Sequence, residues 1–183
     1  MVLVSVQGCV PLDQADANRL QPGHDQGRLE PLFACDEMLA RLARLLRAAG
    51  HDALLAEAGM PDAALLAVAR TEGRVLLTRD RHLASTAGVQ VVLIEADVPE
   101  EQAAELARAY PVDWLRAPLT RCLIDNAALR PATSQEIEQA PAFARDLVGD
   151  FTTCLSCGRL YWPGSHARRI MDKLRALAGQ GSS

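Results

Sequence analysis

The spacing of hydrophobic positions changes along the chain, and each spacing predicts one kind of element. The short apolar run over 32–35 predicts a buried strand. From Met38 to Ala49, leucines and alanines recur at helical spacing with arginines opposite, and Gly50 is a stop signal for the helix. We therefore expect order to begin with a strand and an amphipathic helix.

Strand and helix signals continue to alternate up to about Tyr110. One helix is expected to begin at Pro61, with Asp62 as its capping residue, and to end before Gly73. Another is expected to begin at Pro99, since proline favours the first helical position and two glutamates follow it. Further strands are predicted over three apolar runs, 53–55, 75–78 and 89–94. This alternation predicts an α/β fold with a mostly parallel sheet and flanking helices.

The pattern changes after Pro118. Cysteines appear, the strand signals fade, residues 133–150 are polar and partly helical in pattern, and a last helix is expected from Ser165, its predicted cap. We therefore expect a flexible, extended lead-in over 1–30, an α/β domain over 31–117, and a small module with a terminal helix over 118–178.

Composition narrows the classes of function. The chain has 183 residues, of which 49% are hydrophobic and 23% charged, as in ordinary globular proteins. No run approaches the roughly 20 apolar residues of a membrane span, so no membrane partner is expected. The five cysteines and the absence of a secretory signal pattern predict a reducing, cytoplasmic location, with cysteines as metal ligands or core residues.

Charge is distributed unevenly along the chain. The net charge is −4, which excludes a general binder of polyanions. Between Cys154 and Arg175, however, the sequence has five basic residues and one acid. This segment is therefore positive, and the rest of the chain is acidic. An acidic body with a basic tail is a first, indirect indication of function.

Carboxylates follow the predicted strands. Asp36 follows the first strand, Asp80 the third, and Glu95 and Asp97 the fourth, while Asp62 begins a helix on the same side. Ligands of open parallel sheets bind beyond the carboxyl ends of the strands. Converging carboxylates repel one another unless a cation neutralises them, and oxygen ligands suit Mg²⁺ or Mn²⁺. Such an ion can activate water for phosphodiester cleavage.

The residues alone leave alternatives open for each acid. Asp62 could be only a helix cap, Asp80 could be a turn residue, and Glu95 and Asp97 could be solvated surface groups. Cys35 alternates with Asp36 along the strand and is expected to face the core.

Four segments resemble the Mut7-C RNase domain family, a branch of the PIN-like nucleases. Residues 33–52, which begin Phe-Ala-Cys-Asp-Glu-Met, are similar to the opening of that domain, and residues 62–69 and 75–81 resemble its next two motifs. The run Cys-Leu-Ser-Cys-Gly-Arg-Leu-Tyr-Trp-Pro-Gly-Ser-His over 154–166 resembles its C-terminal zinc ribbon. The segments occur in the same order over about residues 31–175.

The resemblance implies a PIN-like, metal-dependent endoribonuclease, with Asp36, Asp62 and Asp80 as the acids that hold Mg²⁺ or Mn²⁺ and with RNA as the partner. Typical PIN domains have one more acid on a helix between the first two motifs. Here Glu37 directly follows Asp36, and no clear counterpart exists. The alternative hypothesis is a non-catalytic RNA-binding or adaptor protein that retains the fold. A toxin-like nuclease with a protein antitoxin as partner is a variant of the ribonuclease hypothesis.

A Cys-x-x-Cys pair predicts a metal site in the second module. Cys154 and Cys157, followed by glycine, form a knuckle of the kind that directs two thiolates at one Zn²⁺ ion. The resemblance implies a second Cys-x-x-Cys, and the corresponding segment here has Cys122 but Asp125 in place of the second cysteine. Either Asp125 or His166 is the fourth ligand, or the ribbon has lost its zinc. A redox Cys-x-x-Cys would instead need a helix N-terminus after a strand.

The end of the ribbon motif suggests contacts with RNA. Trp162 could stack on a base while Arg168 and Arg169 bind phosphates. In the alternative interpretation, Trp162 packs the last helix onto the ribbon. His166 could also contact a phosphate near the nuclease edge.

Overall fold

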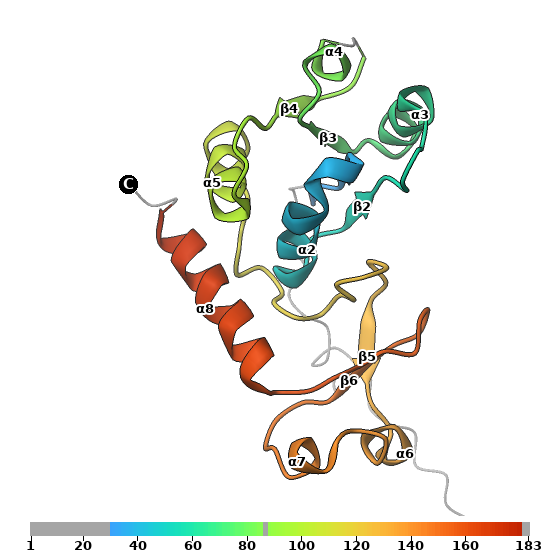
Figure 1. The fold of residues 1–183 in the computed structure, drawn as a ribbon, viewed down its shortest axis with the longest axis vertical. Helices are drawn as coiled ribbons and strands as arrows, with labels where there is room; N and C mark the ends of the chain where they lie inside the picture. The colour runs from blue at the N-terminus through green and yellow to red at the C-terminus, as the bar shows by residue number, and fades with distance from the viewer. Residues whose placement is uncertain (1–29, 86–87, 181–183) are drawn as a thin grey trace, which may run out of the picture. The chain divides into compact units, whose positions relative to one another are not determined.

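The computed structural model describes residues 30–85 and 88–180 of the chain (Figure 1). From Pro31 onward the chain forms one compact unit. The lead-in expected over 1–30 lies outside the described residues, apart from its last position. In the part that is described, no helix has both the length and the apolar content needed to cross a bilayer.

Four short strands form a parallel sheet, as the sequence predicts. They are β1 (Phe33–Cys35), β2 (Ala53–Leu55), β3 (Val75–Thr78) and β4 (Val91–Leu93), in the order β2-β1-β3-β4. Every residue of β1 and β3 is buried. Because helices cover both faces of the sheet, these strands are continuous apolar runs rather than alternating ones.

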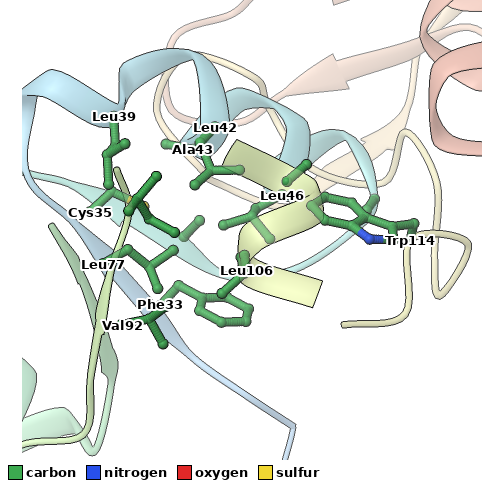
Figure 2. Close-up of a cluster of buried hydrophobic side chains, with 14 of the residues drawn as sticks. Phe33, Cys35, Leu39, Leu42, Ala43, Leu46, Leu77, Val92, Leu106 and Trp114 are labelled. Atoms are coloured by element: carbon green, nitrogen blue, oxygen red, sulfur yellow. The ribbon is translucent and has the colours of Figure 1, made fainter. Parts of the chain in front are cut away.

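One face of the sheet carries the main core. The helices on this face are α2 (Ala40–Ala48), preceded by the 3₁₀ turn η2 (Glu37–Leu39), α5 (Pro99–Ala109) and α8 (Ser165–Gln180). Figure 2 shows Phe33, Cys35 and Leu77 of the sheet packed with side chains of α2 and α5 and with Trp114. Cys35 is fully buried there, and burial raises the pKa of its thiol to about 12, so its assignment as a core residue is confirmed.

The opposite face of the sheet packs against α3 (Asp62–Glu72) and α4 (Arg81–Ala84). Helix α3 ends at Gly73, which has the left-handed φ of 64° that suits glycine, as expected. Its start differs from the prediction, because Pro61 is the capping position and Asp62 is the first helical residue, with no capping bond. Helix α4 was not predicted, since one turn is too short to show a period.

The second module is a small antiparallel sheet with two one-turn helices. Its strands are β5 (Leu129–Pro131), β6 (Thr152–Cys154) and β7 (Leu160–Tyr161), in the order β5-β6-β7. Helices α6 (Ser134–Ile137) and α7 (Ala142–Arg145) lie in the segment predicted to be partly helical. The expectation that strands fade here is wrong: strands of two or three residues carry too few positions to show alternation.

The second module adjoins the amino-terminal edge of the parallel sheet. Ala117 and Leu119 donate backbone N–H groups to carbonyls at the end of α2, at 3.0 and 2.8 Å. Gly50 permits this approach, because a Cβ there would lie 2.3 Å from the carbonyl oxygen of Ala117. Helix α8 then leaves the module and buries Leu174 and Leu177 in the main core. The small module and the sheet thus share the last helix.

Candidate active site and metal centre

Asp36 lies at the carboxyl end of β1 and is only 9% exposed. Its Oδ1 accepts the backbone N–H of Met38 at 2.9 Å, which caps η2. Its Oδ2 accepts the hydroxyl of Thr78 at 2.5 Å and the backbone N–H of Arg79 at 2.8 Å. The register of β1 and β3 sets these contacts. Cys35 pairs with Leu77, so the residues that follow them, Asp36 and Thr78, lie side by side.

Asp80 belongs to the same hydrogen-bond network. Its backbone N–H donates to the Thr78 hydroxyl oxygen at 2.9 Å, and that hydroxyl donates in turn to Asp36. The Asp80 carboxylate caps α4, with Oδ1 accepting from His82 and Leu83 at 2.6 and 3.3 Å. Asp80 is therefore a helix cap, one link away from Asp36 through Thr78, and its Oδ2 points to no partner among the described residues.

The two acids flank the point where the connections of the sheet diverge. The chain after β1 passes to α2 on one face, whereas the chain after β3 passes to α4 on the other. In open α/β sheets, ligands bind in the crevice between two such strands. Asp36 and Asp80 stand at that position.

Asp62 is exposed at the first residue of α3. The loop before it is tied to η2, because the backbone N–H of Gly59 donates to Glu37 Oε2 at 3.0 Å. Among the described residues, the one group of three or more His, Cys, Asp or Glu whose ligand atoms lie within 4.8 Å of one another lies elsewhere. The shared ion site of Asp36, Asp62 and Asp80 stays a prediction.

Glu95 and Asp97 are ion-paired rather than simply solvated. Arg81 donates to Glu95 at 2.7 Å, and Arg79 donates to Asp97. Both carboxylates are largely exposed, so each pair contributes little to stability. These pairs tie Arg79 and Arg81, the residues on either side of Asp80, to the two acids that follow β4.

A second cluster lies in the small module and consists of Cys122, Asp125, Cys154 and Cys157. One ligand atom from each lies within 4.8 Å of the others. The sulfurs of Cys122 and Cys157 are 3.8 Å apart, and Cys154 Sγ is 3.3 Å from both oxygens of Asp125. Two thiolates on one tetrahedral Zn²⁺, at about 2.3 Å each, would also lie about 3.8 Å apart. The donor set and its spacing therefore fit a tetrahedral metal ion.

The charges of this cluster depend on one another. Burial raises the pKa of Asp125, but hydrogen bonds from the surrounding thiols, that of Cys157 first, and from the Ala127 N–H outweigh it and hold that pKa well below its usual value. The hydrogen bond with Asp125 raises the pKa of Cys157 to about 11. Metal binding would replace these thiol protons, since thiolates are the form that ligates.

Of the two candidates for the fourth ligand, the structure brings Asp125 to the cysteines and leaves His166 at the start of α8, outside the cluster. The redox interpretation is wrong, because Cys154 ends β6 and the chain continues through a turn into β7 rather than into a helix. Tyr161 was predicted only as an aromatic surface for RNA beside Trp162, and its contact with the metal ligands was missed. Its hydroxyl lies 3.1 Å from Cys122 Sγ and accepts the Leu123 N–H at 3.1 Å. The adjacent Tyr161 and Trp162, which follow the Cys154–Cys157 knuckle, were the available sequence signal for this contact.

Arg47 joins the metal-ligand segment to the parallel sheet. It is 4% exposed and donates to the carbonyl of Ala53 at 2.8 Å and to those of Leu123 and Ile124 at 3.1 and 2.6 Å. Burial lowers the pKa of Arg47, and the nearby ionisable groups of Cys35, Cys122 and Asp125 oppose that shift. The sequence showed Arg47 only as one of several arginines on a polar helix face.

Asp52 and Asn126 form a second link. Asn126 donates to Asp52 at 2.8 Å and accepts the N–H of Ala53 at 3.1 Å, and Arg74 donates to the same Asp52 oxygen at 2.6 Å. Asn126, which directly follows the candidate ligand Asp125, thus contacts the start of β2.

Near the predicted RNA-contact residues, the small module and the first half of α8 enclose a groove of about 1240 Å³. Trp162 and Arg168 line it, as does His166, whereas Arg169 does not. His166 therefore lies in this groove rather than beside the acids. Trp162 also packs against Ala140, Ala144 and Phe151 of the small module. This cluster contains no residue of α8, so the predicted packing of the last helix onto the ribbon through Trp162 is not part of it.

The sheet, the two acids at its carboxyl edge and the cysteine cluster together define a parallel α/β protein with a cysteine-rich module after the sheet domain. A family model, the Mut7-C RNAse domain, matches residues 31–174, and the chain belongs to that family. The search of curated proteins and the search of solved structures each return no match.

Proposed function

We propose that this protein is a metal-dependent endoribonuclease whose sheet domain is PIN-like and whose Asp36, Asp62 and Asp80 hold a Mg²⁺ or Mn²⁺ ion. The observation that carries the proposal is family membership together with Asp36 and Asp80 at the diverging connections of the sheet. The donor set fits, because Mg²⁺ keeps several of its waters and needs only a few carboxylates.

Asp36 and Asp80 have different roles in the proposed ion site. Asp36 is held by three donors, so its carboxylate keeps one orientation. Asp80 keeps Oδ2 available while Oδ1 caps α4. A bound ion supplies an activated water and stabilises the charge of the phosphate. In hydrolysis an O–P bond to water forms, the P–O bond to the leaving oxygen breaks, and one proton passes to that oxygen.

We propose further that Cys122, Asp125, Cys154 and Cys157 hold a structural Zn²⁺. Its four ligands leave no open coordination position, as in structural rather than catalytic sites. The ion would fix the small module, which shares Arg47 and Asn126 contacts with the sheet.

A second candidate function is a non-catalytic RNA-binding or adaptor protein that retains the fold. The observation in its favour is that the described acids form no group within 4.8 Å that includes Asp36, Asp62 and Asp80.

Cleavage of labelled single-stranded RNA with Mg²⁺ or Mn²⁺ added separates the two. We expect the wild-type protein to cleave, and Asp36→Asn and Asp80→Asn to lose at least about 100-fold in rate, equal to about 2.7 kcal/mol. Glu138→Gln, an exposed acid that follows α6 in the small module, is the matched control and should keep wild-type activity. No cleavage by a folded, zinc-loaded wild-type protein would favour the adaptor.

A further inference from the structure

The groove beside α8 lies at the opposite edge of the sheet from the acids. The segment that lines it is bonded to the end of α2 and the start of β2, which is the amino-terminal edge. Asp36 and Asp80 follow the carboxyl ends of β1 and β3. Three paired residues at about 3.3 Å each separate the two edges by on the order of 10 Å or more. The groove is therefore a separate site.

The charge of the groove is opposite to that of the protein. Four arginines line it against two aspartates, in a chain of net charge −4. Asp172 pairs with Arg175 at 3.1 Å, and Arg121 is engaged with Asp52. Arg159 and Arg168 are exposed, and neither forms an ion pair within residues 30–85 and 88–180. Arg159 and Arg168 thus remain, with Asp150 as the one other charged lining residue among those described, so the groove keeps a positive excess for an anionic ligand.

The groove also offers aromatic and apolar surface in addition to these charges. Phe143 is 75% exposed and Ile124 is 48% exposed, and the indole of Trp162 lines the same space. Gly164 leaves room for that indole, because a Cβ there would lie 3.0 Å from Trp162 Nε1. Aromatic side chains interleaved with arginines suit unstacked bases and their phosphates, whereas duplex RNA is recognised mainly along its outer surface.

We infer that this groove is an anchoring site for single-stranded RNA, distinct from the cleavage site and on the opposite edge of the sheet. The inference rests on the proposed ribonuclease function and adds a length requirement to it. A substrate must be long enough to occupy the groove and still reach Asp36. Arg159 and Arg168 bind the phosphates of this strand. Arg169, which follows Arg168 in α8, does not bind them.

The test uses the full chain with Asp36→Asn, so that RNA is bound but not cut. Fluorescence anisotropy measures binding of a single strand of about 16 nucleotides, a strand of about 4, and a duplex of the longer sequence. We expect the long single strand to bind most tightly. Arg159→Ala and Arg168→Ala should each weaken it about tenfold and reduce the salt-dependence slope by about 0.7, the value of one single-strand phosphate contact. Arg169→Ala should change affinity less than about twofold, within the range of an exposed surface change.

Equal losses for Arg168→Ala and Arg169→Ala, or duplex binding as tight as single-strand binding, would overturn the inference. So would an absence of RNA binding, which would leave the groove to a protein partner. A cleavage assay in the background with Asp36 intact keeps the two proposals apart. Groove variants should raise KM for the long strand and leave cleavage of the short strand unchanged. If RNA binds in the groove and no variant or metal gives cleavage, the ribonuclease proposal alone fails.

Discussion

The hydroxyl of Thr78 donates a hydrogen bond to Oδ2 of Asp36 across the carboxyl ends of two neighbouring parallel strands. Thr78 is fully buried, and its hydroxyl oxygen also accepts the N–H of Asp80. One hydroxyl thus orients the two acids that follow β1 and β3. This bond gives Thr78 a structural role in the segment 75–81 that resembles a family motif.

Replacing Thr78 by valine should therefore affect both stability and activity. Thr78→Val keeps the shape of the side chain but leaves the Asp80 N–H and one Asp36 oxygen without this partner. We expect a loss of about 1–3 kcal/mol in the free energy of unfolding, measured by urea denaturation, and a lower cleavage rate. Thr78→Ser restores the hydroxyl and should recover most of both. An unchanged Thr78→Val protein would show that the bond has no structural role.

The fourth metal ligand can be tested by zinc content after purification. Asp125→Ala removes the one carboxylate beside the three cysteines, so the protein should retain much less zinc. Asp125→Cys should retain it, because a fourth thiolate completes a common structural set. His166→Ala is the matched control and should keep full zinc content, since His166 lies outside the cluster. Loss of zinc from His166→Ala alone would reverse the assignment.

Arg47 should be necessary for the attachment of the cysteine module to the sheet. Arg47→Met leaves the carbonyls of Ala53, Leu123 and Ile124 without their donor, and each hydrogen bond to a charged group contributes about 1.5–3 kcal/mol. We expect destabilisation of at least about 3 kcal/mol and faster hydrogen exchange in residues 119–127 than in β1 or β3. Arg44→Met, an exposed arginine one turn earlier on the same helix, should change neither.

The sequence predicts the parallel sheet well because its signals are local. Strands β1 and β3 are apolar runs that each end before an acid or a basic residue, and α3 and α5 begin at a proline. Helix α3 also ends at a glycine. The three strands of the small module were missed, because the packing of Phe151 and Trp162 and the hydrogen bonds between β5, β6 and β7 hold them rather than their own propensity.

The candidate sites were predictable to different degrees. Cys154 and Cys157 are close in sequence, and the spacing from Cys122 to Asp125 repeats theirs, so the metal cluster could be found from spacing and resemblance. Thr78, Arg47 and Tyr161 could not be found in this way, because their roles depend on partners up to 77 residues away in the chain. The roles of these three side chains can be inferred only once the positions of the strands and of the cysteine knuckle are known.

The link between Asp52 and its partners should make stability depend on pH in the acid range. Burial raises the pKa of Asp52, but hydrogen bonds from Arg74 and Asn126, together with the charges of Arg74 and Arg121, lower it below its usual value overall. A carboxyl whose pKa is lower in the folded state contributes stability above its unfolded pKa of about 3.9, and this contribution is lost as pH falls through the folded pKa.

Asp52→Asn should thus be less stable than the wild-type protein at pH 7, by about 1–3 kcal/mol, since it loses an ion pair that is about three-quarters buried. The difference should shrink as the pH falls below about 4, as measured by urea denaturation across the acid range. Both proteins carry the same cysteine cluster, so its own response to acid cancels in the difference. Glu57→Gln, which removes an exposed carboxylate, should run parallel to the wild type at every pH. A constant gap between Asp52→Asn and wild type from neutral to acid pH would mean that the Asp52 carboxyl is not held in its charged form by Arg74 and Asn126.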